Sequence, residues 1–139
     1  MSKNDKPNSP PAETVARYYG AISRRDLVAI KSCICEDAKL QFGDVELSGA
    51  TAILDGYADF LGPMLEYKVT ILHLWECAKG TVVVEGEANG KTATKFTVPF
   101  ASILHFRNGR IHCQRDYFDP GKMMPNTCEE TLKREEMKT

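Results

Sequence analysis

The spacing of apolar residues changes near Pro63, and this change constrains the fold more than any other feature of the sequence. Before Pro63 apolar residues recur every three or four positions, which is typical of helices that bury one face. After Pro63 they alternate with polar residues, which is typical of strands with one buried face. Helices followed by strands predict an α+β domain rather than an alternating α/β chain.

Three helices are expected before Pro63. Their buried faces carry, in order, Val15, Tyr18, Tyr19 and Ile22; then Leu27, Ile30 and Ile34; then Ala50, Ile53, Leu54, Tyr57 and Leu61. Asp26 is a favourable N-cap for the second helix, and Gly62-Pro63 ends the third. Short extended segments at 39–42 and 45–47 separate the second helix from the third.

Four extended segments follow, and each junction between them contains a glycine. The segments are 66–78, 81–88, 93–107 and 110–118, with junctions at Lys79-Gly80, Asn89-Gly90 and Asn108-Gly109. Because Asn-Gly supplies the positive φ values that a tight hairpin needs, we expect an antiparallel meander. Pro99 cannot donate a hydrogen bond to a neighbouring strand, so we expect a bulge or an edge position there.

Side-chain alternation in the last two segments places one carboxylate among apolar residues. The core-facing residues of the third segment are expected to include Phe96, Val98, Phe100, Ser102 and Leu104. In the last segment Asp116 shares a face with Arg110, His112, Gln114 and Phe118, while Ile111 lies on the opposite face. Burial disfavours the charged form of a carboxyl group and raises its pKa, so such a group can take and return a proton near neutral pH. Asp116 is therefore the candidate acid-base residue.

Composition excludes several classes of function. The chain has 139 residues, of which 42% are hydrophobic and 27% charged, and its net charge is -1. Such a balanced chain is not expected to bind nucleic acid by charge neutralisation, and no apolar run is long enough for a membrane span or a signal peptide. We expect a cytoplasmic protein with a flexible leader at 1–11, one domain at 12–121, and a tail at 122–139 that is weakly helical or disordered.

Neither the cysteines nor any sequence motif indicates a bound cofactor. The five cysteines are odd in number and scattered, so we expect reduced thiols, with Cys33 and Cys35 acting as small buried residues. Zinc-ligand spacing, a dinucleotide-binding glycine motif, a phosphate-binding loop and an H-E-x-x-H motif are all absent from the sequence. No cofactor and no metal are expected.

The end of the chain resembles a known superfamily. Phe-Arg-Asn-Gly-Arg-Ile at 106–111, followed by Arg-Asp-Tyr-Phe-Asp at 115–119, is similar to the last hairpin of SnoaL-like polyketide cyclases and limonene-epoxide hydrolases of the nuclear transport factor 2-like (NTF2-like) superfamily. The resemblance covers roughly 13–120. It implies a cone in which N-terminal helices pack in the concave face of a curved, mostly antiparallel sheet. The reaction does not follow from it, since this scaffold hosts many.

Two of the resembled enzyme groups match the chain only in part. In the epoxide hydrolases an Asp-Arg-Asp set activates water; Asp116 corresponds to one Asp, whereas Gly86 and Ala88 stand at the other two positions. In the ketosteroid isomerases the first-helix tyrosine that stabilises an oxyanion corresponds to Tyr18, and Phe42 and Ser102 replace the two catalytic aspartates. SnoaL-like cyclases use an aspartate of the last strand as general acid and base, so this group fits best.

We therefore expect Asp116 and Tyr18 to be catalytic. The expected substrate-binding residues are Tyr19, Phe42, Phe100, Ser102, His112, Gln114 and Phe118. The expected function is cofactor-independent proton transfer, of isomerase or cyclase type, on a small apolar metabolite with a carbonyl or epoxide group. The alternative is a non-catalytic ligand-binding or assembly module of the same fold. A further alternative is an epoxide hydrolase with altered catalytic residues.

The outer face of the sheet is expected to be apolar enough to need a partner. Its residues are expected to be Val69, Ile71, His73, Trp75, Ala101 and Ile103. A monomer rarely leaves so large an apolar patch in water. Members of the resembled families commonly pair through this face, so we expect a homodimer.

Overall fold

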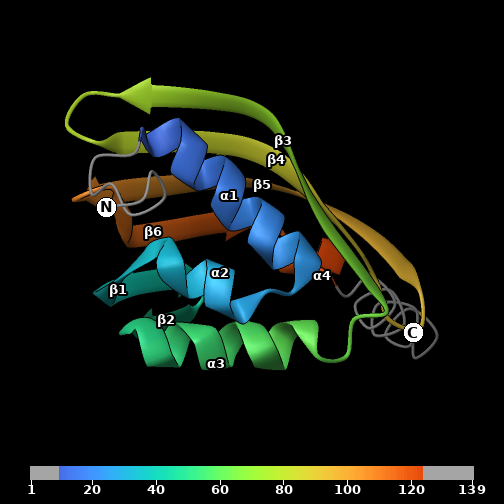
Figure 1. The fold of residues 1–139 in the computed structure, drawn as a ribbon. Coiled ribbons are helices and arrows are strands. Elements are labelled where there is room, and N and C mark those ends of the chain that lie inside the picture. The colour runs from blue at the N-terminus through green and yellow to red at the C-terminus, as the bar shows by residue number, and fades with distance from the viewer. Residues whose placement is uncertain (1–9, 124–139) are drawn as a thin grey trace.

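The structure is a computed structural model and describes residues 10–123. Its elements are, in chain order, α1 (Pro11–Arg24), α2 (Leu27–Ser32), β1 (Ile34–Phe42), β2 (Val45–Ser48), α3 (Ala50–Leu61), β3 (Glu66–Cys77), β4 (Thr81–Lys91), β5 (Lys95–Arg107), β6 (Arg110–Phe118) and α4 (Pro120–Met123). Figure 1 shows α1 and α2 lying over the inner face of a curved sheet, with α3 along its β1 and β2 end. Within the described residues, no helix has the length and apolar character needed to cross a membrane.

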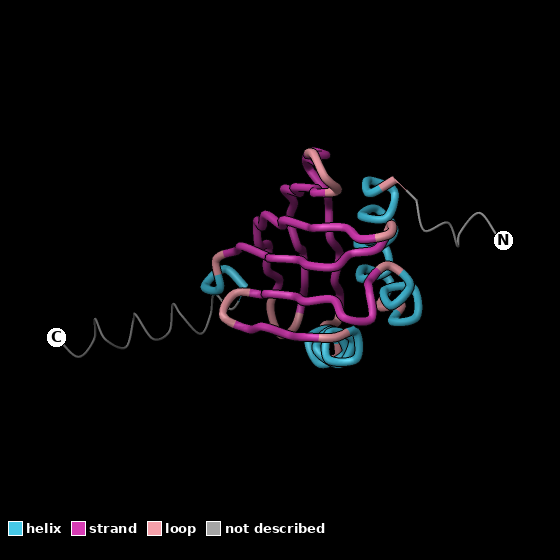
Figure 2. The backbone as a smooth tube through the Cα atoms, turned by 90° about the vertical axis from the view of Figure 1, so that its left-hand side faces the viewer, coloured by secondary structure: helices cyan, strands magenta, loops and turns pink. Residues whose placement is uncertain are grey.

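The strands form one six-stranded sheet in the order β2-β1-β6-β5-β4-β3. The four strands after α3 make the expected antiparallel meander, and β1 joins it by pairing in parallel with β6. The sheet is curved (Figure 2), but it does not close into a barrel, because β2 and β3 are its two edge strands and do not pair with each other. The α+β class and the cone with N-terminal helices in its concave face are confirmed.

The helix boundaries follow local chemistry, with two differences from expectation. The Ala29 N–H donates to Asp26 Oδ1 at 3.0 Å, which confirms Asp26 as the N-cap of α2. Assigning Ile34 to α2 is wrong, because the helix ends at Ser32 and Ile34 already pairs with Ile111 of β6. α1 begins at Pro11, one residue before the expected start of the domain. Residues 1–9 of the expected leader, and all but the first two residues of the expected tail, lie outside the described residues.

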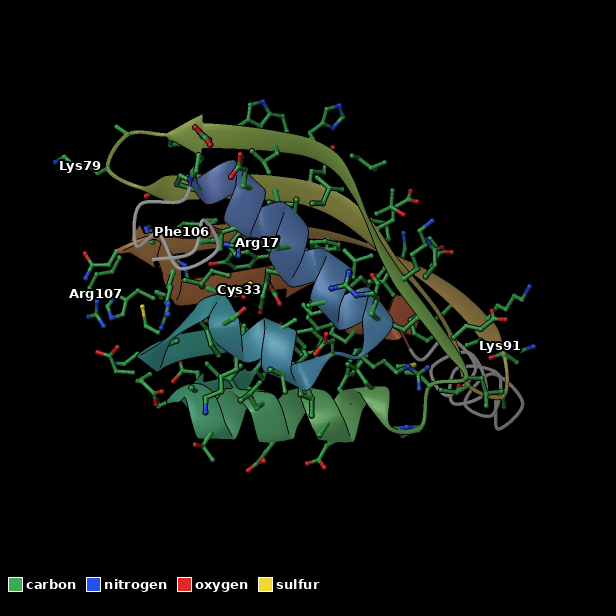
Figure 3. All side chains as sticks on the ribbon, viewed as in Figure 1. Arg17, Cys33, Lys79, Lys91, Phe106 and Arg107 are labelled. Atoms are coloured by element: carbon green, nitrogen blue, oxygen red, sulfur yellow. The ribbon has the colours of Figure 1, made fainter. Side chains whose placement is uncertain are left out.

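Two of the three expected hairpin turns are confirmed. Lys79-Gly80 and Asn108-Gly109 have positive φ at both positions, as a tight turn between twisted strands requires. Asn89-Gly90 is not a turn: both residues stay in β4, opposite Thr97 and Phe96 of β5. Figure 3 labels Lys79 at the first turn and Lys91 at the far end of β4. Gly90 is required there for a different reason, since the Phe96 ring occupies the space of a Cβ.

A bulge in β3 changes which residues face outward. The register of β3 against β4 shifts between Ile71 and His73, so Leu72 is an extra residue. The expectation that Val69 and Ile71 lie on the outer face is therefore wrong, because before the bulge these residues pack toward the core. His73 and Trp75, beyond the bulge, are exposed and their rings stack. The outer face thus differs from the one expected, and the homodimer stays a prediction.

A second irregularity brings Ile111 into the core. His105 pairs with Cys113 but Phe106 pairs with Ile111, which leaves His112 as the extra residue of β6. Ile111 is 1% exposed, so placing it on the face opposite Asp116 is wrong. One extra residue in a strand reverses the alternation on its far side, and nothing in the periodicity of the sequence marks it.

The core lies between α1 and the inner face of the sheet. Its fully covered side chains include Val15 and Tyr18 of α1 and Leu104 of β5. Cys33 and Cys35 are buried, as expected. Pro99 lies just beyond the last residue of β5 that pairs with β6, so it occupies a local edge where its missing N–H is tolerated.

Replacing Gly86 by alanine should destabilise the fold. A Cβ at Gly86 would lie 2.5 Å from the Thr70 carbonyl oxygen and 2.9 Å from the Phe100 ring, and a backbone oxygen in a paired strand has little room to move. We expect the free energy of unfolding, measured by urea titration, to fall by about 1–3 kcal/mol, the usual range for overpacked interiors. Gly20→Ala is the matched control. Its Cβ would meet only the end of Arg24, at 3.2 Å, and alanine favours the helix. Equal stability of Gly86→Ala and the wild type would contradict the packing argument.

Candidate active site

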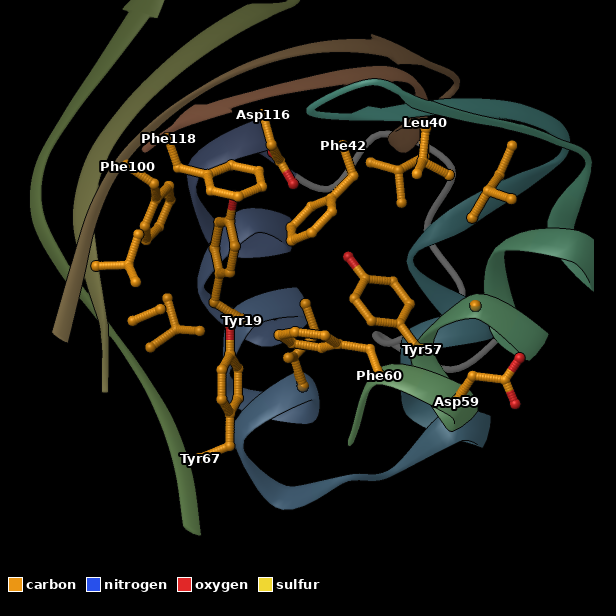
Figure 4. A pocket seen from close by; sticks show the side chains of 17 residues that line it. Tyr19, Leu40, Phe42, Tyr57, Asp59, Phe60, Tyr67, Phe100, Asp116 and Phe118 are labelled. Carbon is orange, nitrogen blue, oxygen red and sulfur yellow. The ribbon is translucent and has the colours of Figure 1, made fainter. Parts of the chain in front are cut away.

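An open pocket of about 520 Å³ lies between the inner face of the sheet and helices α1 and α3. Its volume falls within the roughly 300–1,000 Å³ typical of small-molecule sites. The wall is mainly apolar, and its aromatic residues are Tyr19, Phe42, Tyr57, Phe60, Tyr67, Phe100 and Phe118 (Figure 4). The carboxylates in the lining are Asp116 and Asp59, and no lysine, arginine or histidine contributes to it. The pocket therefore suits a largely apolar ligand without negative charge.

Asp116 places one carboxylate in this apolar wall. It lies in β6, directly opposite Ser102 of β5 and Phe42 of β1. Its Oδ1 accepts hydrogen bonds from Ser102 Oγ at 2.6 Å and from Gln114 Nε2 at 2.9 Å. No described residue donates to Oδ2, and Figure 4 shows the carboxylate reaching toward the pocket. One oxygen thus holds the group in place while the other remains available to a ligand.

The surroundings of Asp116 make it a stronger base than an ordinary aspartate. Burial raises the pKa of the Asp116 carboxyl from 3.8 to about 6, and the hydrogen bonds from Gln114 and Ser102 oppose this rise only in part. At neutral pH the group is mostly ionised, yet it binds a proton about a hundred times more strongly than an exposed aspartate does. This range suits a group that must both accept and release a proton.

Two chains of donors converge on Asp116 Oδ1. Tyr19 donates to Ser102 Oγ at 3.0 Å, and Tyr18 donates to Gln114 Oε1 at 2.6 Å. Tyr18 also shares a short hydrogen bond with Tyr57. Because the one hydroxyl proton of Tyr18 goes to Gln114, Tyr57 is the donor in that bond. Three tyrosine hydroxyls from α1 and α3 are thereby used to orient the two side chains that hold the carboxylate.

The expected site residues divide into two layers. Tyr19, Phe42, Phe100, Asp116 and Phe118 line the pocket. Ser102, Gln114 and Tyr18 lie behind the wall and are buried, and they act on Asp116 through hydrogen bonds rather than on a ligand. The structure therefore brings all eight together. It gives Tyr18 the position of a residue that orients Gln114, in contrast to the expected direct contact with substrate.

His112 is the expected site residue that the structure places elsewhere. Its ring Nε2 lies 3.2 Å from Arg107 Nη1 and 3.9 Å from Asp37 Oδ2, in a partly exposed cluster away from the pocket. Simple alternation along β6 would put His112 on the face of Gln114 and Asp116. The extra residue at this point turns His112 outward and Ile111 inward, so His112 does not reach the pocket.

Three aromatic residues of the pocket were not among those expected: Tyr57, Phe60 and Tyr67. Tyr57 belongs to the apolar stripe of the third helix, so the sequence marks it as buried but not as part of a site. Tyr67 alternates with Val69, and both face inward because they precede the Leu72 bulge. Regular alternation along β3, without the bulge, would place this part of the strand on the outer face, so the sequence pattern does not predict Tyr67 as a pocket residue.

Asp116→Asn should stabilise the fold in a pH-dependent way. The folded carboxyl titrates at about 6 and an unfolded one near 3.8, so between these values the folded state binds more protons. The stability that Asp116 contributes is therefore complete below about pH 4 and lost as pH rises through 6. The shift corresponds to about 3 kcal/mol. Asparagine cannot ionise, so urea unfolding should show the variant to be more stable than the wild type by up to that amount at about pH 8 and similar at about pH 4. A difference that does not change with pH would contradict the assigned pKa.

Ser102→Ala should raise the pKa of Asp116 further. The substitution removes a donor to the ionised form, and hydrogen bonds to charged groups contribute about 1.5–3 kcal/mol, so we expect a rise of at least about one unit. The titration can be followed by ¹³C NMR of the side-chain carboxyl, assigned with Asp116→Asn. Ser48→Ala, at an exposed position of β2, is the control and should leave the titration unchanged. An unchanged or lowered pKa in Ser102→Ala would contradict the role of Ser102.

Comparison with solved structures gives several close matches in shape. A protein with a ketosteroid isomerase-like fold from Catenulispora acidiphila has a TM-score of 0.74 and 21% identity, covering 79% of this chain and 88% of that one. A protein named as a SnoaL-like polyketide cyclase from Shewanella denitrificans has a TM-score of 0.75 and 17% identity, covering 86% and 97%. An LEH-like epoxide hydrolase of M. tuberculosis has a TM-score of 0.74 and 16% identity, covering 88% and 92%. At such low identities these matches show the fold alone.

Comparison at the level of sequence is more decisive about the family. No protein of curated function matches the chain. The family described as the SnoaL-like domain matches residues 15–113, which include most of the helices and strands that form the cone. The match ends before Asp116, so the role of this carboxylate rests on the geometry of the pocket. The chain belongs to the SnoaL-like domain family.

Proposed function

We propose that the chain is a cofactor-independent enzyme of isomerase or cyclase type that moves a proton on a small apolar molecule with a carbonyl group. The observation that carries this proposal is the position of Asp116. Its carboxylate is held through one oxygen, has the other open to an apolar pocket, and has a pKa of about 6. A positioned base of this strength is what removal of a proton next to a carbonyl requires.

The proposed step uses Asp116 Oδ2 as a base and then as an acid. The C–H bond next to the carbonyl breaks, its proton passes to Oδ2, and its electron pair forms the enolate. The protonated carboxyl then returns the proton to another carbon of the substrate. In ring closure the enolate carbon instead attacks a second carbonyl carbon of the same molecule, the π electron pair of that carbonyl moves to its oxygen, and this oxygen takes the proton from the carboxyl. The apolar wall favours this step, because electrostatic interactions are stronger where water is excluded.

A non-catalytic ligand-binding module is the second candidate. The apolar lining favours it, and so do Gly86 and Ala88 at positions where the resembled hydrolases carry catalytic residues. Epoxide hydrolysis has less support, because activating water and protonating an epoxide call for two cooperating groups. The second carboxylate of the lining, Asp59, is exposed at the rim, and Figure 4 shows it pointing away from the pocket.

Hydrogen exchange in a simple ketone tests the proposal directly. β-Tetralone is an uncharged bicyclic ketone with acidic C–H groups beside its carbonyl, and their exchange with deuterium in D₂O can be followed by ¹H NMR. The wild type should accelerate this exchange above the buffer rate, with kcat/KM rising as Asp116 ionises near pH 6. Asp116→Asn should lose at least about 100-fold, the lower range for removal of a general base.

Asp55→Asn provides the matched control, since Asp55 is an exposed carboxylate of α3 outside the pocket lining. It should exchange at the wild-type rate. Full activity of Asp116→Asn would contradict the assigned base. Binding of the ketone without exchange by the wild type would favour the non-catalytic module.

A further inference from the structure

The pocket contains one hydroxyl group that is not used to support Asp116. Three tyrosines line it: Tyr19, Tyr57 and Tyr67. The Tyr19 hydroxyl donates to Ser102 and the Tyr57 hydroxyl donates to Tyr18, so both hydroxyl protons already take part in hydrogen bonds within the protein. The Tyr67 hydroxyl has no hydrogen-bond partner among the described residues. Its oxygen is not among the fully buried polar atoms without a partner, so it is accessible to a ligand or to solvent. It is therefore the tyrosine of the wall whose proton is free for a ligand.

The position of Tyr67 is set by two contacts. It lies near the start of β3, opposite Gly90 of β4, and its ring packs edge-on against Phe60 of α3 with centroids 5.3 Å apart. Figure 4 shows its hydroxyl directed into the cavity, across from the wall that carries Asp116. A ligand between the two walls can therefore meet a hydroxyl donor on one side and a carboxylate oxygen on the other.

We propose that Tyr67 binds the carbonyl oxygen of an uncharged ring ketone, while the adjacent C–H group of the same molecule faces Oδ2 of Asp116. This inference rests on the proposed function and identifies a catalytic residue and a substrate class for it. Breaking the C–H bond moves the electron pair toward the carbonyl, whose oxygen becomes negative. Tyr67 donates to that oxygen, and the proton resides on Asp116 until it is returned to carbon.

The electrostatics of the pocket support this division of roles. Burial and the nearby charge of Asp116 raise the pKa of Tyr67, so it remains a protonated donor throughout the working pH range. No cationic side chain lines the cavity, so a substrate carboxylate or phosphate would enter without a counter-charge beside the ionised Asp116. A neutral ligand with a single acceptor oxygen avoids that repulsion and satisfies the free hydroxyl.

Tyr67→Phe tests the role in turnover. The substitution keeps the ring and its contact with Phe60 and removes only the hydroxyl. We expect kcat for deuterium exchange into β-tetralone to fall roughly 10- to 100-fold with a smaller change in KM, because the hydrogen bond strengthens as the oxygen becomes charged. Tyr117→Phe is the matched control, since Tyr117 is 50% exposed and outside the pocket lining. It should retain wild-type kinetics.

Binding of two related probes separates hydrogen bonding from packing. β-Naphthol resembles the enol form of β-tetralone, and β-methylnaphthalene has a similar shape without the oxygen. Tyr67→Phe should weaken β-naphthol binding by about tenfold, consistent with loss of one hydrogen bond, and leave the hydrocarbon within about twofold. Equal weakening of both probes would assign Tyr67 to packing alone, and unchanged β-naphthol affinity would overturn the proposal.

The two proposals fail in distinguishable ways. Exchange that depends on Asp116 but not on Tyr67 would overturn the role of Tyr67 and leave the proposed function in place. Absence of exchange in the wild type, combined with Tyr67-dependent binding of β-naphthol, would overturn the enzymatic function and retain Tyr67 as the ligand's hydrogen-bond donor.

Discussion

The hydrogen bonds from Ser102 and Gln114 to a single oxygen of Asp116 are the interactions on which the site depends. An unpaired carboxylate in an apolar interior is strongly destabilising, so it would be expected to bind a proton or move into water. Here Oδ1 is fully supported, so the side chain stays in the wall. The support originates in Tyr18 and Tyr19 of α1. The docking of α1 on the sheet is therefore part of the site as well as part of the core.

The sequence predicts the fold well wherever local chemistry alone decides it. The stripe of α1, the Asp26 cap and the Asn108-Gly109 turn each depend on residues close together in the chain, and the structure confirms all three. Asn89-Gly90 carries the same local signal as the turn at Asn108, yet it stays within β4. The two Asn-Gly pairs differ in their tertiary contacts. Gly90 accommodates the ring of Phe96 from the next strand, and this contact cannot be predicted from the residues next to Gly90 in the sequence.

The candidate site is predictable to the extent that strands alternate regularly. Asp116 is found by alternation because β6 is regular from Cys113 onward. The misplacement of His112 and the omission of Tyr67 have one common cause, because His112 is itself the extra residue of β6 and Tyr67 lies before the extra residue of β3, Leu72. A strand bulge reverses the facing of every residue on one side of it while leaving the composition unchanged. A single bulge therefore makes the predicted face wrong for several residues at once, as it does for Tyr67, Val69 and Ile71.

A lone buried carboxylate also limits which reactions the pocket suits. Hydrolysis consumes a water molecule, and its two proton transfers occur at different atoms, so two cooperating groups serve it best. Gly86 has no side chain and is covered by the ring of Phe100, and Asp59 lies at the rim of the pocket. Neither position therefore provides a second acid-base group beside Asp116. One carboxylate is sufficient when the proton taken from the substrate is returned to the substrate, as in isomerisation or ring closure. Its pKa of about 6 lies where taking and releasing that proton are both feasible near neutral pH. The geometry therefore favours reactions that conserve the substrate's own proton.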